Sequence, residues 1–206
     1  NGEYEKIILL ADKAFNSWRE TSFERRFELM KNAAKVLRKN SEEYSALMTI
    51  EMGKPIVQSR AEVEKCALVC EYYANNAEKF LADEIINTEA AKSFVSYQPL
   101  GVILAVMPWN FPFWQVFRFA APNLMAGNAG LLKHASNVSG SALLIESVFR
   151  EAFPTTVLQT ILLDGSRTLD LLSLKEIAGV TFTGSTNIGR KIGEAAGKNL
   201  KKSVLE

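Results

Sequence analysis

Val102-Ile103-Leu104-Ala105-Val106, followed by Met107-Pro108-Trp109-Asn110-Phe111-Pro112, is the stretch that decides both the fold and the site. The first five residues are apolar and mostly branched, which predicts a buried strand. Two prolines, each with φ fixed at about −65° and without an N–H, then bracket a Trp and an Asn. A stiffened loop that presents an amide beside a flat aromatic ring is more than a connector needs. It indicates a site that requires a fixed amide donor and an apolar wall.

The composition is that of a globular protein. With 206 residues and 48% apolar content, the chain can bury a core as one large domain or two small ones. The 24 Lys and Arg residues nearly balance the 23 Asp and Glu residues, and no basic block offers a footprint for nucleic acid. No apolar run reaches membrane-spanning length, and Asn1-Gly2-Glu3 does not begin like a signal peptide. We expect a cytoplasmic protein without a membrane or nucleic-acid partner.

The cysteines are Cys66 and Cys70, four residues apart in a helical pattern. This spacing places both on one face of a helix rather than in a metal-binding knuckle. We expect buried, inert thiols and no metal site.

The first 82 residues repeat apolar side chains at helical spacing. Thr21 with Glu24 predicts a capping box, Ser41 predicts a second N-cap, and Gly53 followed by Pro55 ends a helix. Residues 83–98 lose the helical period, and residues 93–97 alternate like a half-exposed strand. We predict a β-hairpin arm there, which serves oligomerisation.

Residues 99–206 alternate strands with helices. The expected strands are 102–106, 129–133, 157–162 and 179–183, and the expected helices are 114–126, 139–152 and one after Ser185. This alternation predicts an α/β fold with a doubly wound parallel sheet. Ligands of such sheets bind at the carboxyl ends of the strands.

Polar residues follow two of these strands. Lys133 closes a strand and precedes His134 and Ser136, which would suit a ribose or a phosphate, although a solvated strand end is the simpler alternative. Gly184-Ser185 opens a helix, where free N–H groups attract an anion, although plain capping is equally compatible with a Ser. The two features together are stronger evidence for a ligand site than either feature alone.

These segments, in order, resemble the motifs of the aldehyde dehydrogenase superfamily over essentially all 206 residues. The matching segments are 108–112, Lys133, Phe182-Thr183-Gly184-Ser185, Ser203-Val204-Leu205-Glu206 and, near the N-terminus, Glu51-Met52-Gly53-Lys54-Pro55. The resemblance implies a Rossmann-like sheet, NAD or NADP as cofactor, an aldehyde substrate and a homo-oligomer. It also implies that Asn110 stabilises an oxyanion and that Glu206 is the general base. The cofactor-binding residues that it implies are Met107, Pro108, Trp109, Lys133, Ser136, Gly184 and Ser185.

The sequence departs from the family pattern after Lys133. The family often has Pro next and Glu three residues after the Lys, where this chain has His134 and Ser136. A Glu would accept both ribose hydroxyls and repel a 2′-phosphate, whereas a Ser leaves room for that phosphate. We expect NADP to be tolerated, and the preference between NAD and NADP stays open. His134 is interpreted as a packing or hydrogen-bonding residue.

The helix after Pro112 carries Trp114 and Arg118, four residues apart and therefore expected on one face. Their positions resemble bacterial succinate semialdehyde dehydrogenases, in which the Arg would bind the substrate carboxylate and the Trp would form a wall. The alternative for Arg118 is a surface arginine that pairs with a Glu or with solvent.

The resemblance implies a nucleophilic Cys beyond Glu206, and Cys66 and Cys70 cannot replace it from the helical N-terminal stretch. We therefore expect residues 1–206 to be the cofactor-binding portion of an enzyme, less than half of a typical family chain. We expect this portion to lack the catalytic domain and to be inactive alone. Two other hypotheses are a nucleotide-binding module without catalysis and an interaction protein that binds no cofactor.

Overall fold

The N-terminal part of the chain is helical, as its apolar periodicity predicts. The computed structural model describes residues 2–206, so Asn1, the first residue of the segment that does not begin like a signal peptide, lies outside the described residues. The helices are α1 (Gly2–Trp18), α2 (Phe23–Lys39), α3 (Ser41–Met52) and α4 (Ile56–Phe80). Helix α3 ends at Gly53, whose φ of 77° is left-handed.

Two predicted helix starts are wrong by one residue. The N-cap of α2 is Ser22, whose Oγ accepts from the Arg25 N–H at 3.3 Å, so Thr21 and Glu24 form no capping box. The N-cap of α3 is Asn40, and Ser41 is already helical. Neighbouring Ser, Thr and Asn residues all suit an N-cap, so packing of the helix decides which one is used.

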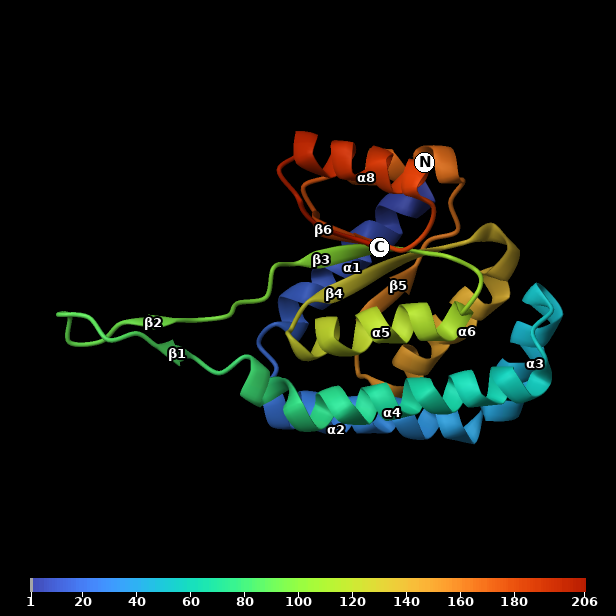
Figure 1. Ribbon diagram of the computed structural model, residues 1–206, viewed down its shortest axis with the longest axis horizontal. Helices are drawn as coiled ribbons and strands as arrows, with labels where there is room; N and C mark the ends of the chain where they lie inside the picture. The colour runs from blue at the N-terminus through green and yellow to red at the C-terminus, as the bar shows by residue number, and fades with distance from the viewer. Residues whose placement is uncertain (1) are drawn as a thin grey trace.

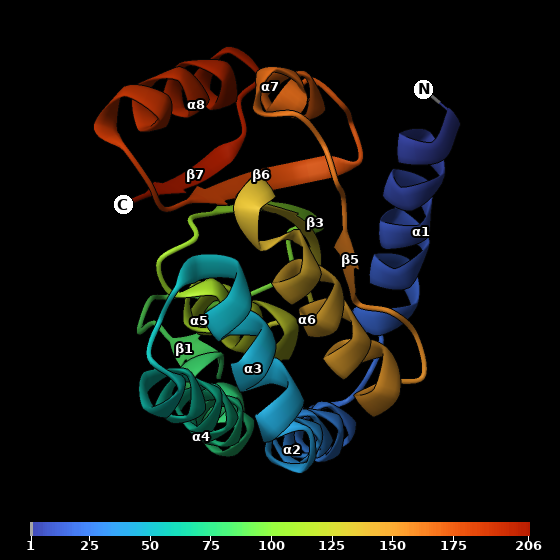
Figure 2. The ribbon, with the colours of Figure 1, turned by 90° about the vertical axis from the view of Figure 1, so that its right-hand side faces the viewer.

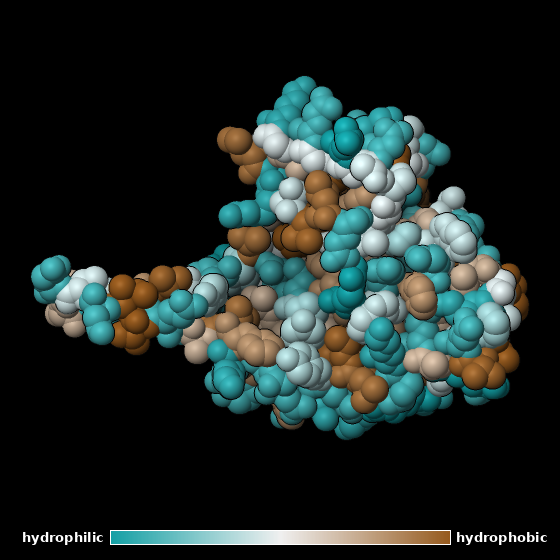
Figure 3. All heavy atoms as spheres, in the orientation of Figure 1, coloured by the Kyte–Doolittle hydropathy of each residue, from teal (hydrophilic) through white to brown (hydrophobic). Residues whose placement is uncertain are grey.

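The predicted hairpin is present between α4 and the sheet. Strands β1 (Glu84–Ile85) and β2 (Phe94–Val95) pair antiparallel, with Glu84 opposite Val95. Figure 1 shows this arm extending away from the body of the molecule, and Figure 3 shows apolar surface along it. We call residues 84–97 the arm.

A five-stranded parallel sheet forms the centre of the chain. Its strands lie in the order β5-β4-β3-β6-β7, and every neighbouring pair is parallel. Their bounds are β3 (Val102–Met107), β4 (Ala129–His134), β5 (Leu158–Thr160), β6 (Ile177–Phe182) and β7 (Lys202–Leu205). Strand β3 is buried at all six residues. Strand β5 is shorter than predicted, and β7 was not predicted.

Helices cover both faces of the sheet. The later helical segments are α5 (Pro112–Met125), η1 (Ser136–Val138), α6 (Ser139–Ala152), η2 (Gly165–Arg167), α7 (Thr168–Leu171) and α8 (Thr186–Lys198). One core lies among α2 to α6 and the sheet, and the other lies among α1, α7, α8 and the opposite face (Figure 2). The doubly wound α/β prediction is therefore confirmed. None of the helices described is long and apolar enough to cross a membrane.

Candidate active site

The carboxyl ends of the strands gather at one edge of the sheet, because all five strands are parallel. Met107 ends β3, His134 ends β4 beside Lys133, and Glu206 follows β7. Backbone hydrogen bonds fix these ends together: the Thr183 N–H donates to the Val106 carbonyl at 3.1 Å, and the Gly184 N–H donates to the Glu206 carbonyl at 3.1 Å. The predicted residues of four strands thus share one edge.

The loop 108–111 presents the predicted oxyanion donor to solvent. Asn110 is exposed, and its side-chain amide has no hydrogen-bond partner within residues 2–206. Its neighbours Trp109 and Phe111 are 50% and 46% exposed, and Pro108 is half-buried. An unpartnered amide on a proline-braced loop is free to donate to a ligand.

His134 ties this loop to the end of β4. Its Nδ1 accepts from the Ala135 N–H at 2.9 Å, so Nε2 carries the proton and donates to the Pro112 carbonyl at 2.9 Å. Burial lowers the pKa of His134, which keeps the ring neutral. The hydrogen-bonding role interpreted from the sequence matches these contacts.

A first cavity of about 470 Å³ lies beyond β4 and against α8. We call it the α8 cavity. Its lining residues are Val106, Lys133, Gly165, Ser166, Thr168, Leu169, Ile188, Lys191 and Ile192. Of the predicted cofactor residues only Lys133 lines it. Three of the others are exposed: Ser136 lies three residues after Lys133, and Gly184 and Ser185 lie just before α8.

Two cations, Lys133 and Lys191, line the α8 cavity, and the Asp164 carboxylate lies near Lys133. Burial lowers the pKa of Lys133, and the nearby Asp164 opposes that shift. Asp164 accepts hydrogen bonds from the Ser166 N–H and hydroxyl at 2.9 and 2.6 Å, which lower the pKa of its carboxyl. The lowered pKa of Asp164 favours its charged carboxylate, which faces the partly buried Lys133.

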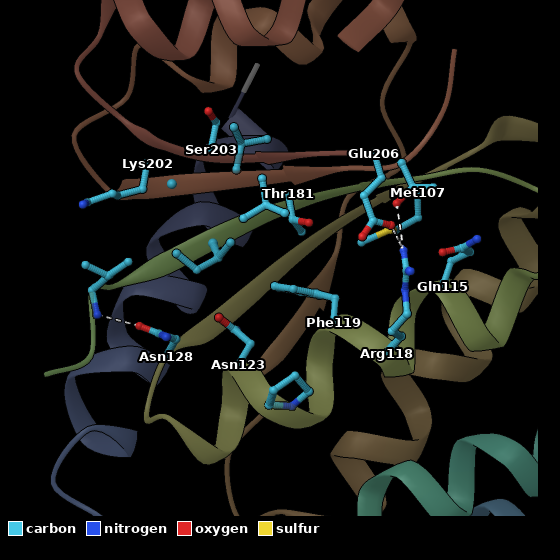
Figure 4. Close-up of a pocket in the computed structure, with 17 residues that line it drawn as sticks. Met107, Gln115, Arg118, Phe119, Asn123, Asn128, Thr181, Lys202, Ser203 and Glu206 are labelled. Carbon is cyan, nitrogen blue, oxygen red and sulfur yellow. Dashed lines mark hydrogen bonds and ion pairs between the residues drawn. The ribbon is translucent and has the colours of Figure 1, made fainter. Parts of the chain in front are cut away.

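A second cavity, of about 520 Å³, lies between α5 and the strands β6 and β7 (Figure 4). We call it the α5 cavity. Arg118 points from α5 to Glu206, with which its Nη2 forms an ion pair, and the same nitrogen lies 3.4 Å from the Thr183 hydroxyl. Met107 lines the same cavity. The structure thus brings Arg118 and Glu206 together, and pairing with a Glu was the alternative considered for Arg118.

Trp114 does not share this cavity with Arg118. Its half-buried ring faces α4, where the Lys65 ammonium lies 3.8 Å from the ring centroid. Gln115 and Phe119 flank Arg118 in the cavity instead. Four helical positions turn by about 40°, which is enough to separate the two side chains where neighbouring elements pack on both sides of the helix.

Neither cysteine lies at the site. Cys66 and Cys70 are fully buried on α4, and burial raises the pKa of both thiols. No group of three His, Cys, Asp or Glu side chains in the described part of the chain could hold a metal ion.

Comparison with known proteins settles the family. The sequence profile of the aldehyde dehydrogenase family matches residues 1–206. The chain belongs to the aldehyde dehydrogenase family.

Relatives within the aldehyde dehydrogenase family carry a narrower name. A probable NADP(+) succinate-semialdehyde dehydrogenase of Synechocystis sp. is 54% identical over 198 residues, which are 96% of this chain and 44% of that protein. An NAD(P)+ succinate semialdehyde dehydrogenase of Escherichia coli is 45% identical over 205 residues, covering 99% of this chain and 44% of that protein. The chain therefore spans less than half the length of these relatives.

A solved structure agrees with the fold. A Streptococcus pyogenes succinic semialdehyde dehydrogenase in complex with NADP+ superposes with a TM-score of 0.94 and 35% identity, covering 98% of this chain and 45% of that one. The Rossmann-like fold expected from the resemblance is confirmed.

Sequence reasoning missed several cavity residues of this aldehyde dehydrogenase chain. Thr183 in the α5 cavity directly follows β6, and Asp164 beside the α8 cavity lies in the loop after β5, four residues beyond its end. The rule that ligands meet strand ends could have found them. Lys191 lies one turn inside α8, and no motif marks it.

Proposed function

We propose that this chain forms the cofactor-binding part of an NAD(P)-dependent succinate-semialdehyde dehydrogenase. It supplies the oxyanion donor Asn110, the general base Glu206 and the carboxylate-binding Arg118. The observation that carries the proposal is the α5 cavity, where a guanidinium and a carboxylate meet beyond the strand end that leads to the loop of Asn110. The names of the relatives support the choice of substrate.

The α8 cavity fits the adenosine half of NAD or NADP. Its aliphatic residues Val106, Leu169, Ile188 and Ile192 form apolar walls for a flat base, and no side chain is within 4 Å of the Cβ position of Gly165. Lys133 and Ser136 would hold the ribose, and Gly184 and Ser185 before α8 would meet the pyrophosphate. The bound cofactor would supply the hydride acceptor for the oxidation.

The residues of this chain divide the remaining work. Asn110 donates its amide N–H to the oxygen of the aldehyde as negative charge develops there. Arg118 binds the distant carboxylate of the semialdehyde, which displaces Glu206 and leaves it free to take a proton from water. The attacking thiolate comes from elsewhere in the whole protein, because Cys66 and Cys70 are buried in α4.

Arg118→Ala in the full-length protein that carries these residues tests the substrate. A charged hydrogen bond of this kind is worth roughly 2 to 4 kcal/mol, so kcat/KM for succinate semialdehyde should fall about 30-fold to 1000-fold. An uncharged aldehyde of the same length should lose little. Equal losses for both aldehydes would show that Arg118 does not recognise a carboxylate, and the substrate would revert to an unspecified aldehyde.

A further inference from the structure

A buried ion pair under the Asn110 loop has no part in the proposed chemistry. Lys54, in the turn between α3 and α4, pairs with Glu62 on α4, and their side chains are only 5% and 2% exposed. Buried pairs of this kind contribute little net stability compared with apolar residues of the same size. Stability alone therefore does not account for the pair, which also contacts the segment after Asn110.

Glu62 caps the helix that follows the loop. The N-cap position of α5 is Phe111, which has no acceptor, and Pro112 in the first turn has no N–H. The next two N–H groups, of Phe113 and Trp114, both donate to Glu62 Oε1 at 2.9 Å. The cap thus comes from a residue 51 positions away instead of from the loop itself.

Lys54 holds the other side of the same loop. Its ammonium lies 3.9 Å from the centroid of the Phe111 ring while it pairs with Glu62 Oε2. The pair therefore contacts the loop at Phe111 and at the first turn of α5, directly after Asn110. The residue next to Asn110 and the helix start that follows it are thus contacted by Glu62 on α4 and by Lys54 in the turn before α4.

We propose that Lys54 and Glu62 are positioning residues that hold the Asn110 amide where the oxyanion develops. This inference rests on the proposed function of Asn110. The pair acts on the chemical step more than on binding of the adenosine half of the cofactor, because the residues proposed to hold that half lie on β4, on η1 and before α8.

Glu62→Met in the full-length enzyme tests this role. Loss of a fixed geometry of this kind should lower kcat about 10-fold to 100-fold, while KM for NADP changes less than about twofold. Hydrogen exchange of the Phe113 and Trp114 amides should become faster, because both lose their acceptor. An unchanged kcat would overturn the inference.

Glu51→Met is the matched control. Glu51 caps α6 from the same helical pair, because its carboxylate accepts from the Gly140 and Ser141 N–H groups at 2.7 and 2.9 Å. Glu51→Met should lower the melting temperature by about as much as Glu62→Met does, and it should leave kcat at saturating cofactor unchanged. An equal fall of kcat in both variants would mean that stability alone is being measured.

A double-mutant cycle with Asn110→Ala decides whether the pair acts through Asn110. In that background Glu62→Met should cause no further loss of kcat, and a further loss of full size would overturn the inference. If Asn110→Ala alone leaves kcat unchanged, the proposed function fails instead. Should Glu62→Met not fold, Lys54→Met/Glu62→Met removes both buried charges and should fold with kcat still low; a recovered kcat would contradict positioning.

Discussion

At the scale of single residues, Ser136 bears on the choice of dinucleotide. It is exposed at the start of η1, three residues after Lys133. In Ser136→Glu the new carboxylate would accept the ribose hydroxyls of NAD and repel the 2′-phosphate of NADP. We expect the ratio of kcat/KM for NADP to kcat/KM for NAD to fall at least about 10-fold in the full-length enzyme. The reason is that repulsion between two like charges at hydrogen-bond distance costs more than about 1.4 kcal/mol. Ser136→Gln, of equal size but neutral, is the control, and an unchanged ratio in Ser136→Glu would refute the proposed ribose contact.

His134 gives the chain a pH dependence that can be assigned to one group, because it is the only histidine. Burial lowers its pKa below the ordinary 6.5, so the unfolded chain binds this proton at a higher pH than the folded chain does. Its stability contribution is complete above pH 6.5 and is lost as the pH falls toward the folded pKa, by at most about 1.4 kcal/mol per unit. Urea unfolding between pH 7.5 and about 5 should show this loss in the native chain and a weaker one in His134→Gln. Identical pH profiles would contradict the assignment.

At the scale of elements, the sequence predicts what local chemistry decides. Gly53 and Gly127 mark helix ends because both need a positive φ, and α6 begins and ends where its apolar period does. Strand β7 escaped prediction because its four residues are all exposed and do not alternate, so only pairing with β6 makes them a strand. The caps from Glu51 and Glu62 also escaped, since contacts across 51 or more positions depend on the tertiary fold.

Two glycines at helix ends separate backbone strain from crowding. A Cβ on Gly127 would lie 2.7 Å from the Arg26 guanidinium, whereas a Cβ on Gly53 would meet nothing within 4 Å. Arg26 is buried and donates to the Met125 carbonyl at 3.1 Å, so it has little room to move. Gly53→Ala should cost about 1 kcal/mol of unfolding free energy, and Gly127→Ala about 2 to 4 kcal/mol. Equal costs in chemical denaturation would mean that Arg26 yields without penalty.

At the scale of the whole molecule, the candidate site is a product of assembly. Lys133, Asn110, Arg118 and Glu206 come from four segments that only the parallel sheet brings to one edge. Because all five strands are parallel, residues that follow different strands in the sequence lie at the same edge, as the alternation of strands and helices predicted. Motif spacing could not predict which side chains line each cavity, because that depends on helix rotation, as Trp114 and Arg118 demonstrate.

The arm carries an exposed apolar surface, which predicts self-association of these 206 residues. Its side chains Ile85, Ile86, Phe94, Val95 and Tyr97 are each 43% to 67% exposed, and its two short strands keep free edges. Strand β7 adds a fully exposed edge to the central sheet. Light scattering should therefore find the chain above the mass of a monomer.

Charged substitutions on the arm locate the contact. Phe94→Glu combined with Val95→Lys should shift the chain toward monomer, because burying an unpaired charge in an apolar contact costs on the order of several kcal/mol. Ile50→Lys is the matched control, since Ile50 is 79% exposed on α3 and lies outside the arm. A monodisperse monomer of the unmodified chain at high concentration would contradict self-association. Loss of the oligomer in Ile50→Lys, with the arm variant unaffected, would place the contact on the helical face instead.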